Sequence, residues 1–479
     1  MSEDRRDVVV IGAGVTGLTA AYELQKQRPG LDLLVLERRP EPGGNIRTET
    51  VDGFVIDAGP DSFLRTKPDA IALCRELGLD GELITPRAGA SKVFMASGGA
   101  LHEMPAGMAL AVPTRVEPLL RSPLLSLQGK LRMLADVVLP PHFGEAGDRG
   151  YDESIAQFIT RRFGREAADR IGASLLGGIY AGDIQQLSVR STFPQLLELE
   201  RTHGSLIRGF LATRRPPPAP KAKSTGAPPS PFQSLRSGMS SLIDALRGRL
   251  PPGALVTGAE VAEVRPVVDG YAIRLARGET LRSAAVILAA PAHAAARMLP
   301  DPKLRAELSA IPYVSTATIF FALDRRAVDH PLGGSGFVVP PGEGSILAAT
   351  WVTSKWDGRA PADQVLLRAF VGGAREPDLV ENATDAELIE RARAELTRLM
   401  GPLGRERFSR VHRYIRSNPQ PVVGHAARLG RLRERLAELP GLQIAGAAYD
   451  GVGIPDCVRQ GKAAARAVLA EVLPRAGVC

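Results

Sequence analysis

The feature that most constrains this chain is a glycine-rich stretch near its start, VVVIGAGVTG, which runs from Val8 to Gly17. Its apolar residues predict a buried parallel strand, and an apolar helical pattern begins directly behind the last glycine. A second apolar run, LDLLVLE, ends at Glu37, twenty residues beyond Gly17. The glycines Gly12, Gly14 and Gly17 let a diphosphate approach the start of the helix, and the acid suits a ribose hydroxyl. The stretch therefore predicts a dinucleotide site in a Rossmann-like α/β fold.

A second strand–turn–helix unit lies near the far end of the chain. The run LQIAG predicts a strand at 442–446, and the stretch YDGVGIPDCVRQGKAA follows it. Glycines free the backbone of this turn, and Pro455 suits the first position of a helix. We therefore expect the free N–H groups near Val452, Gly453 and Ile454 to face a ligand.

The chain has one GxGxxG pattern, whereas a flavoprotein that exchanges hydride with NADPH usually has two. The choice is then between NAD alone and FAD alone. The segment ERRPEPGGNIRTE favours the longer FAD, because Arg47 follows the glycine pair closely enough to meet a phosphate. FAD would run from the fingerprint past Gly44 to the C-terminal helix, whose positive end would stabilise the reduced flavin ring.

Charge and cysteine content limit the classes of ligand and the compartment that we expect. The 479 residues include 60 basic and 52 acidic side chains, a net charge of +8. No basic tract is interleaved with aromatic residues, so we expect acidic small molecules and no nucleic acid. Three cysteines without a CxxC pattern or a histidine cluster argue for a reducing compartment and no metal site. Without a signal peptide or an apolar run of ~20 residues, we expect a cytoplasmic protein with at most peripheral contact with the inner face of the membrane.

The remaining patterns divide the chain into four parts. The apolar run AAVILAAP predicts another strand of the parallel sheet, strand patterns recur between 313 and 371, and leucine-rich amphipathic segments lie between them and the N-terminal unit. The leucine-rich segments either pack as ordinary helices or present a basic surface to lipid. The expected parts are an FAD-binding domain (5–85, 232–298 and 415–479), an α+β substrate-binding domain (86–104 and 299–414), an inserted helical domain (105–212) and a disordered proline-rich loop (213–231).

Six segments resemble the FAD-dependent porphyrinogen oxidases of haem biosynthesis. They are GAGVTGL, GGNIRT, GGIYAGDIQQLSVRSTFPQ, FQSLRSGMSSLIDAL, VILAAPAHAA and YDGVGIPDCVRQGKAA, and the match extends over nearly the whole chain. Within that family, STFPQ, TWVTSKW and LLRAFVGGAR are most similar to the coproporphyrinogen III oxidases of the coproporphyrin-dependent branch. Protoporphyrinogen IX oxidases are the close alternative.

The resemblance implies a p-hydroxybenzoate hydroxylase-like FAD domain, a substrate domain and an inserted helical domain. It implies oxidation of coproporphyrinogen III to coproporphyrin III by six electrons, with O₂ as acceptor, three H₂O₂ as by-product and hand-off to the next haem-pathway enzyme. No catalytic side chain is expected, because flavin N5 carries the chemistry. By motif position, Lys92 binds a propionate, the carbonyl of Gly178 lies over the macrocycle, and Phe370 packs on it. The implied FAD contacts are Gly12, Gly14, Gly17, Glu37, Gly44, Gly59, Val261, Val452, Gly453 and Ile454.

One departure from the family pattern lies at 418–425, which lacks the tyrosine of the usual Pro-Gln-Tyr; Tyr414 stands where a tryptophan is often found near the flavin. Two other interpretations stay open. The same fold could oxidise amines or carotenoids, or the chain could bind FAD or haem without catalysis. An amine oxidase is expected to have paired aromatic residues at the C-terminal glycine turn, whereas Tyr449 here follows Ala447 and Ala448.

Overall fold

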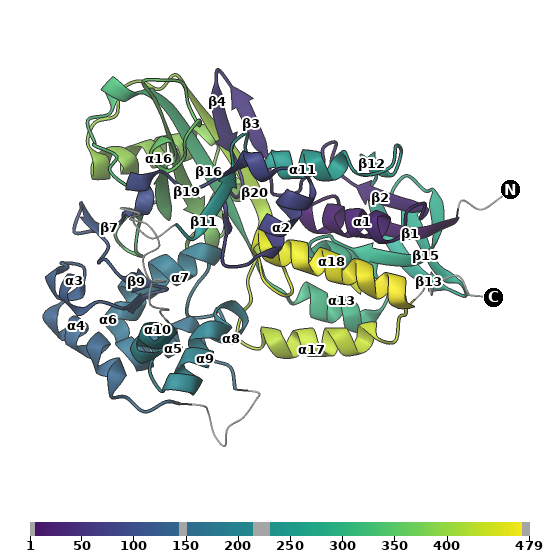
Figure 1. Cartoon of the computed structure of the whole chain (residues 1–479), viewed down its shortest axis with the longest axis horizontal. Helices are drawn as coiled ribbons and strands as arrows, with labels where there is room; N and C mark the ends of the chain where they lie inside the picture. Colours follow the sequence, from purple (N-terminus) through teal and green to yellow (C-terminus); the bar gives the residue numbers. More distant parts are fainter. Residues whose placement is uncertain (1–4, 143–150, 214–229, 472–479) are drawn as a thin grey trace, which may run out of the picture.

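The computed structural model describes residues 5–142, 151–213 and 230–471. Two seven-stranded sheets and a group of helices form three neighbouring regions (Figure 1). The predicted proline-rich loop at 213–231 falls almost wholly outside the described residues. Within the described residues, no helix is both long and apolar enough to cross a membrane.

The first sheet is built around the glycine-rich N-terminal strand. Across the sheet, the strands are β12 (Leu255–Thr257), β2 (Leu33–Glu37), β1 (Arg5–Ile11), β15 (Thr280–Leu288), β14 (Gly270–Leu275) and β13 (Val261–Val267), with β21 (Leu442–Ile444) beside β15. β1 pairs in parallel with β2 and β15, and β15 pairs in parallel with β21. The parallel strand predicted from AAVILAAP and the strand predicted at 442–446 are therefore confirmed.

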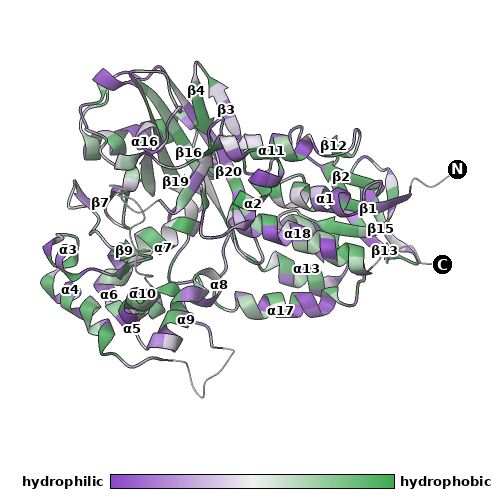
Figure 2. Ribbon diagram, viewed as in Figure 1, coloured by the Kyte–Doolittle hydropathy of each residue, from purple (hydrophilic) through white to green (hydrophobic). Residues whose placement is uncertain are grey.

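Helices cover both faces of the first sheet, because its central strands are apolar on both sides. Val8 and Val10 of β1 enter one hydrophobic cluster, and Val9 and Ile11 enter another. The first face is covered by α1 (Val15–Gln27), α2 (Asp69–Glu76), α11 (Ser240–Arg247) and α18 (Ile454–Glu471), and the second by α12 (Ala292–Met298), α13 (Pro302–Ser309) and α17 (His425–Leu436). Figure 2 shows hydrophobic and hydrophilic residues along both α17 and α18, as expected for helices with one side against a sheet.

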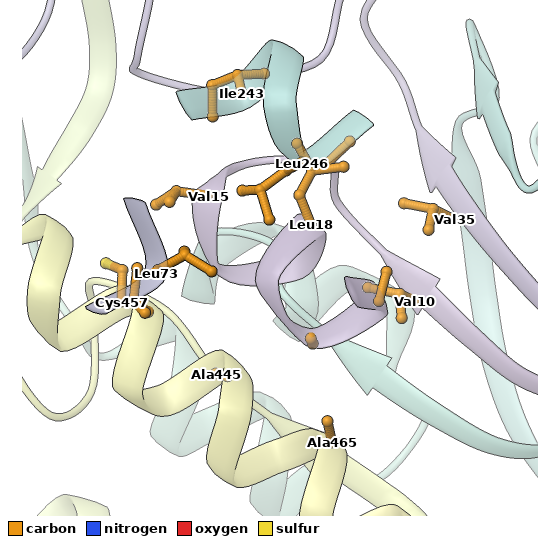
Figure 3. Packing of buried hydrophobic residues seen from close by; sticks show 14 of the residues in the cluster. Val10, Val15, Leu18, Val35, Leu73, Ile243, Leu246, Ala445, Cys457 and Ala465 are labelled. Carbon is orange, nitrogen blue, oxygen red and sulfur yellow. The ribbon is translucent and has the colours of Figure 1, made fainter. Parts of the chain in front are cut away.

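The first and last helices pack against each other, so the two ends of the sequence share one core. α1 and α18 lie side by side (Figure 1). Figure 3 shows Leu18 of α1 and Cys457 of α18 in the same cluster as Leu246 of α11. A Cβ at Gly461 would lie 2.4 Å from the carbonyl oxygen of Thr16, so a side chain there would push the two helices apart.

The second sheet is mainly antiparallel. Across it run β20 (Phe408–Pro419), β16 (Tyr313–Asp324), β19 (Gln364–Gly372), β18 (Ala348–Trp351), β17 (Gly336–Val338), β7 (Val93–Ser97) and β8 (Ala100–Glu103). Alternate residues such as Ile319 and Leu367 are buried under α16 (Asp385–Met400), and the opposite face bears Thr318, Arg368 and Phe370. The strands between 313 and 371 were predicted, whereas β7, β8 and β20 were not. β20 also takes residues 415–419 into this sheet, although their sequence pattern had suggested the FAD domain.

The third region is helical and has its own core. Its elements are a small hairpin of β9 (Met108–Ala109) and β10 (Val112–Pro113) and the helices α3 (Val116–Arg121), α4 (Leu127–Leu134), α5 (Ile155–Phe163), α6 (Arg165–Ala167), α7 (Ala173–Tyr180), α8 (Val189–Thr192), α9 (Pro194–His203) and α10 (Leu206–Thr213). Arg162 is buried there beside Asp136 and Glu200, which satisfies a charge that would be costly to bury alone. The remaining elements are β3 (Thr48–Val51), β4 (Phe54–Asp57), β5 (Phe63–Leu64), β6 (Leu83–Ile84), β11 (Phe232–Leu235), α14 (Val352–Lys355) and α15 (Leu379–Asn382).

Candidate active site

A cavity of about 430 Å³ lies where the first and second sheets meet. It is lined by the fingerprint turn, the residues after β2, the Gly43–Ile46 turn, the start of β13, the residues after β15, the end of β20 and the turn before α18. Seven predicted cofactor residues line it: Gly12, Gly14, Glu37, Gly44, Val261, Val452 and Ile454. Four others lie outside the lining: Gly17, Arg47, Gly59 and Gly453.

The fingerprint glycines are needed for different reasons. Gly12 has φ +105°, and a Cβ there would lie 2.8 Å from the carbonyl oxygen of Ala289. A Cβ at Gly17 would lie 1.9 Å from the carbonyl oxygen of Gly12, so this glycine serves the packing of α1 on β1. Gly14 leaves the start of α1 open toward the cavity, where the N–H groups of the helix favour an anion.

Both carboxylate oxygens of Glu37 accept hydrogen bonds from backbone N–H groups at the cavity. Oε2 accepts a hydrogen bond from the N–H of Ala13 at 2.8 Å, and Oε1 accepts one from the N–H of Arg39 at 2.9 Å. The side chain is 8% exposed. A carboxylate has about four lone-pair sites, so two remain for the two hydroxyls of a ribose.

The Gly43–Gly44 turn lies directly against the fingerprint. The N–H of Gly43 donates to the carbonyl of Ala13 at 2.8 Å, and Gly44 has φ +61°. A Cβ at Gly44 would lie 3.3 Å from the Cα of Gly14, so both glycines keep this part of the cavity narrow. Arg39, which sequence reasoning did not select, lines the cavity and donates to the carbonyl of Gly44 at 3.0 Å. Burial, together with neighbouring arginine charges, lowers the pKa of Arg39.

Arg47 lies further from the cavity than predicted. Its side chain is exposed and outside the lining. Its carbonyl accepts a hydrogen bond from the N–H of Ala58 at 2.9 Å, so its backbone holds the strand that leads to Gly59. Phosphate binding by Arg47 therefore has no support from its position and stays a prediction.

The turn before α18 presents a helix start to the cavity. Gly451 has φ +110°, and a Cβ there would lie 2.7 Å from Cγ of Asp456. Asp456 occupies the first turn and pairs with Lys67 at 2.7 Å. Val452 and Ile454 line the cavity, and within the described residues the N–H groups of positions 452 to 454 have no protein acceptor. The predicted helix start is thus in place, with free donors at one end of the cavity.

A loop from Ala58 to Pro60 connects the cavity to the second sheet. The guanidinium of Arg368 donates to the carbonyls of Ala58 and Gly59 at 2.8 and 2.6 Å, and Thr318 donates to Ala58 at 3.0 Å. Pro60 lines the cavity. A Cβ at Gly59 would lie 1.9 Å from the carbonyl oxygen of Asn45, so Gly59 permits a close backbone approach without lining the cavity itself.

Phe370 and Gly178 both lie outside the lining of this cavity, on β19 and α7, whose ends meet. Phe370 is half-buried, with the guanidinium of Arg368 4.3 Å from its ring centroid. Gly178 and its neighbour Ile179 are exposed near the end of α7. The N–H of Ala374, just beyond β19, donates to the carbonyl of Ala181, just beyond α7, at 2.8 Å. Because Val452 packs against the helical core that contains α7, the helix start of α18 belongs to the same junction.

Lys92 is not part of this junction. Its ammonium pairs with Glu103 at 2.9 Å, and both side chains are about half exposed. Val93 and Met95 share the sheet face of Phe370, because β7 pairs with β17 in register. The alternation of an extended chain therefore directs Lys92 to the other face, where Glu103 also lies. The structure separates Lys92 from Phe370, and a propionate role for Lys92 stays a prediction without geometric support.

Several lining residues escaped the sequence analysis. Arg38, His293, Arg297 and Arg416 all line the cavity. Burial, followed by the charges of these three arginines, lowers the pKa of His293 to about 4. The available signals were the arginine directly after Glu37 and the AHAAAR segment that follows VILAAP. No sequence pattern marked Arg416 as a lining residue, because it reaches the cavity through an irregularity in β20.

Tyr414 lies beside the Gly59 loop, near the region where the sequence predicted altered flavin packing. Its hydroxyl is buried without a hydrogen-bond partner in the described part of the chain, and burial raises its pKa. A Cβ at Gly59 would lie 3.2 Å from this hydroxyl.

The residues of the cavity fit FAD. Glycines and the start of α1 suit a diphosphate, Glu37 suits a ribose, and the start of α18 suits a ring that gains negative charge on reduction. The described residues contain no group of three or more His, Cys, Asp or Glu that could hold a metal ion.

Comparisons with known proteins agree with this geometry. Residues 15–469 match the family of flavin-containing amine oxidoreductases. The chain is 37% identical to coproporphyrinogen III oxidase of Bacillus subtilis (strain 168), over 97% of this chain and 98% of the relative, and 31% identical to protoporphyrinogen oxidase of Bos taurus, over 97% and 98%. A crystal structure from Exiguobacterium sp. 255-15, described as a protoporphyrinogen oxidase, superposes with a TM-score of 0.84 at 32% identity, covering 98% of this chain and 99% of that one.

Proposed function

Because the chain belongs to the family of flavin-containing amine oxidoreductases, we propose that it is an FAD-dependent oxidase that converts coproporphyrinogen III to coproporphyrin III in haem biosynthesis. The observation that carries the proposal is the near full-length similarity to coproporphyrinogen III oxidase. The fit of the cavity to FAD supports it.

When bound, FAD supplies the acceptor for two electrons at a time. The residues of the protein bind FAD and the substrate and orient them. The N–H groups at the start of α18 would stabilise negative charge on the bound ring, and Arg368 fixes the loop at Gly59 against the second sheet. No acid–base side chain is required of this chain, since positioning of the reacting C–H bond is the main demand.

The substrate is a large, flexible, mostly apolar ring with carboxylate arms, so it needs an apolar slot, an acceptor for pyrrole N–H and cations at the rim. Phe370 supplies an apolar face, and the exposed Gly178–Ile179 segment supplies an opposite wall with a backbone carbonyl. The carbonyl of Gly178 accepts from the N–H of Ala181 at 3.2 Å, and one of its lone pairs remains for a pyrrole N–H.

The reaction balances with dioxygen as the acceptor. Coproporphyrinogen III loses six electrons and six protons in three cycles, and three O₂ take them up as three H₂O₂. Use of O₂ and delivery of the porphyrin to the next enzyme of haem biosynthesis are parts of this proposal, as are a cytoplasmic location and the division into FAD, substrate and helical domains.

The direct test is to mix the purified protein with each porphyrinogen and to follow porphyrin fluorescence and H₂O₂ together. We expect a higher kcat/KM with coproporphyrinogen III than with protoporphyrinogen IX, and three H₂O₂ per porphyrin. A higher kcat/KM with protoporphyrinogen IX would instead favour protoporphyrinogen IX oxidase, which the 31% identity to the bovine enzyme also supports. Formation of porphyrin and H₂O₂ no faster than without the protein would indicate a binding protein and exclude the oxidase.

A flavin amine oxidase is the more distant alternative, and the turn before α18 argues against it. Tyr449 is 7% exposed and follows two alanines, so this turn offers no aromatic pair to enclose an amine. Absence of H₂O₂ with primary and polyamine substrates is the expected result.

A further inference from the structure

Three arginines at the cavity are without partners. Arg38, Arg297 and Arg416 line it, and within the described residues none of their side chains makes a hydrogen bond or an ion pair. Neighbours on the same strand behave differently: Arg410 pairs with Glu49 at 3.0 Å, and Arg413 pairs with Asp385 at 2.6 Å. Exposed arginines elsewhere, such as Arg326, also lack a partner among the described residues, so what distinguishes Arg38, Arg297 and Arg416 is that all three line one cavity.

Arg416 reaches the cavity through a bulge in β20. The pairing with β16 is regular up to Tyr414 and resumes at Asn418, and the register shifts between them. Arg416 has φ +43°, unusual for a residue other than glycine, and its N–H donates to the hydroxyl of Ser315 at 2.9 Å. In a regular strand successive side chains point to opposite faces, but residues 415, 416 and 417 all line the cavity. Bulges commonly redirect a side chain near a functional site.

The other two arginines come from the first sheet. Arg38 follows Glu37 at the end of β2, and Arg297 lies in the last turn of α12. His293, in the first turn of α12, packs edge-on against Tyr313 with ring centroids 4.8 Å apart. Burial first, and then the charges of Arg416, Arg297 and Arg38, lower the pKa of His293.

Both arginine-bearing segments are attached to the fingerprint turn. Beside Arg416, the carbonyl of Ser417 accepts a hydrogen bond from the side chain of Asn45 at 3.4 Å, and Asn45 follows the glycine pair that packs on Gly14. On the other side, the N–H of Ala289, a few residues before α12, donates to the carbonyl of Ile11 at 2.8 Å. These bonds hold the segment of Arg416 and the chain that leads into α12 next to the fingerprint turn.

We propose that Arg38, Arg297 and Arg416 form a cationic site for the diphosphate of FAD, in addition to the N–H groups of α1. Three like charges held together without counter-ions raise the energy of the empty site, and two phosphates relieve that repulsion. The inference depends on FAD as cofactor and is independent of which porphyrinogen is oxidised. Guanidinium groups suit phosphate oxygens because they donate in a planar fork.

The test is the affinity of the holoenzyme for FAD, measured as recovery of flavin fluorescence on dilution at about 0.02 M and about 0.5 M KCl. Arg416→Gln is expected to weaken FAD binding about tenfold at low salt and less at high salt, and Arg297→Gln about threefold. Arg416→Lys should restore part of the loss. Arg326→Gln is the matched control, since Arg326 is exposed, lies outside the cavity lining and has no partner among the described residues; its FAD affinity should equal that of the unaltered protein.

Competition separates the diphosphate from the rest of the cofactor. The inhibition constant of ADP, calculated from competition with the FAD affinity measured for each protein, should rise in Arg416→Gln, whereas the inhibition constant of adenosine should be unchanged. The proposal is overturned if Arg416→Gln and Arg326→Gln retain FAD equally, or if adenosine is affected as much as ADP. It is also overturned if Arg416→Gln raises KM for the porphyrinogen without changing FAD affinity, since the arginine would then bind a substrate carboxylate. All three results leave the proposed oxidation itself standing.

Discussion

The two sheets contribute to the site in different ways. The first sheet works through its backbone: glycines at the fingerprint and at the Gly43–Gly44 turn admit a ligand, and the starts of α1 and α18 supply N–H groups. The second sheet works through side chains on one face, such as Phe370 and Arg368, and through a bulge that redirects Arg416. A backbone site depends on short stretches of sequence, whereas a side-chain site depends on which strands pair and in what register.

The difference predicts that the first region tolerates substitution less than the second. A Cβ at Gly17 or Gly59 would lie 1.9 Å from a backbone oxygen, which cannot move without moving a strand. Phe370 is half-buried at the edge of a cavity, so a smaller side chain there leaves its neighbours in place.

The largest effect is expected at the fingerprint. Gly17→Val should destabilise the protein by about 3 kcal/mol or more and prevent FAD binding, because the side chain overlaps the carbonyl of Gly12. The measurements are the urea midpoint and the FAD content after purification. Gly430→Ala in α17 is the control, since a Cβ there meets nothing within 4 Å, and we expect equal or slightly higher stability. A stable, flavin-loaded Gly17→Val protein would contradict the backbone account of the first sheet.

The next effect is expected at the opposite end of the cavity. Gly453→Glu adds a negative charge at the start of α18, where a Cβ would lie 3.1 Å from Oδ2 of Asp456. It should prevent FAD retention or, where FAD stays bound, its reduction, because the helix start no longer favours negative charge on the ring. Flavin absorbance with and without dithionite reports both. Gly430→Glu carries the same charge on the surface of α17 and should leave the spectrum unchanged; an identical, fully reducible spectrum for Gly453→Glu would refute the role of the α18 helix start.

The sequence predicted the first region well because its signals are local. The fingerprint, Glu37, the strand at AAVILAAP and the helix start near Ile454 are each defined by a few neighbouring residues, and the structure has all four in the expected elements. Even there, the backbone contacts of Glu37 with Ala13 and Arg39 could not be foreseen, because they depend on the curve of the loop after β2.

The second region was predicted less completely because its site depends on long-range pairing. β20 was not predicted. Its bulge lets residues 415, 416 and 417 all line the cavity, whereas in a regular strand successive side chains would point to opposite faces. Lys92 was placed by motif position, but pairing of β7 with β8 puts it beside Glu103. Arg38, Arg297 and His293 lie in the first region yet were missed for the same reason, since they act together only in the folded chain.

A third, smaller effect tests the face of the second sheet. Phe370→Leu is expected to raise KM for the porphyrinogen about tenfold, because apolar contact with the macrocycle is lost, while FAD affinity stays unchanged. Phe94→Leu is the matched control, since Phe94 is also partly buried but lies on the opposite face, against Trp351. Steady-state kinetics compare the two. A KM change in Phe94→Leu equal to that in Phe370→Leu would show that the effect comes from the sheet as a whole.

The smallest expected effect concerns His293. Because burial and three arginine charges lower its pKa from 6.5 to about 4, the folded protein holds this proton more weakly than the unfolded chain does. Its contribution to the free energy of unfolding is therefore complete above pH 6.5 and declines as the pH falls toward about 4. Both proteins are compared after removal of FAD. Between pH 7 and pH 5 the free energy of unfolding of His293→Asn should fall by about 1 kcal/mol less than that of the unaltered protein, after allowance for solvent screening.

Urea unfolding at the two pH values measures this difference. The effect should shrink when FAD is bound, because the phosphates offset the arginine charges around the imidazole. Equal acid sensitivity of the variant and the unaltered protein would mean that burial and the arginine charges do not lower the pKa of His293.

The most direct test of the whole account is an anaerobic mixing experiment with the purified holoenzyme. The account predicts one FAD per chain and bleaching of that flavin when coproporphyrinogen III is added without oxygen, with recovery of its absorbance when air is admitted. A chain that binds no FAD, or a bound flavin that stays oxidised in the presence of coproporphyrinogen III, would contradict it.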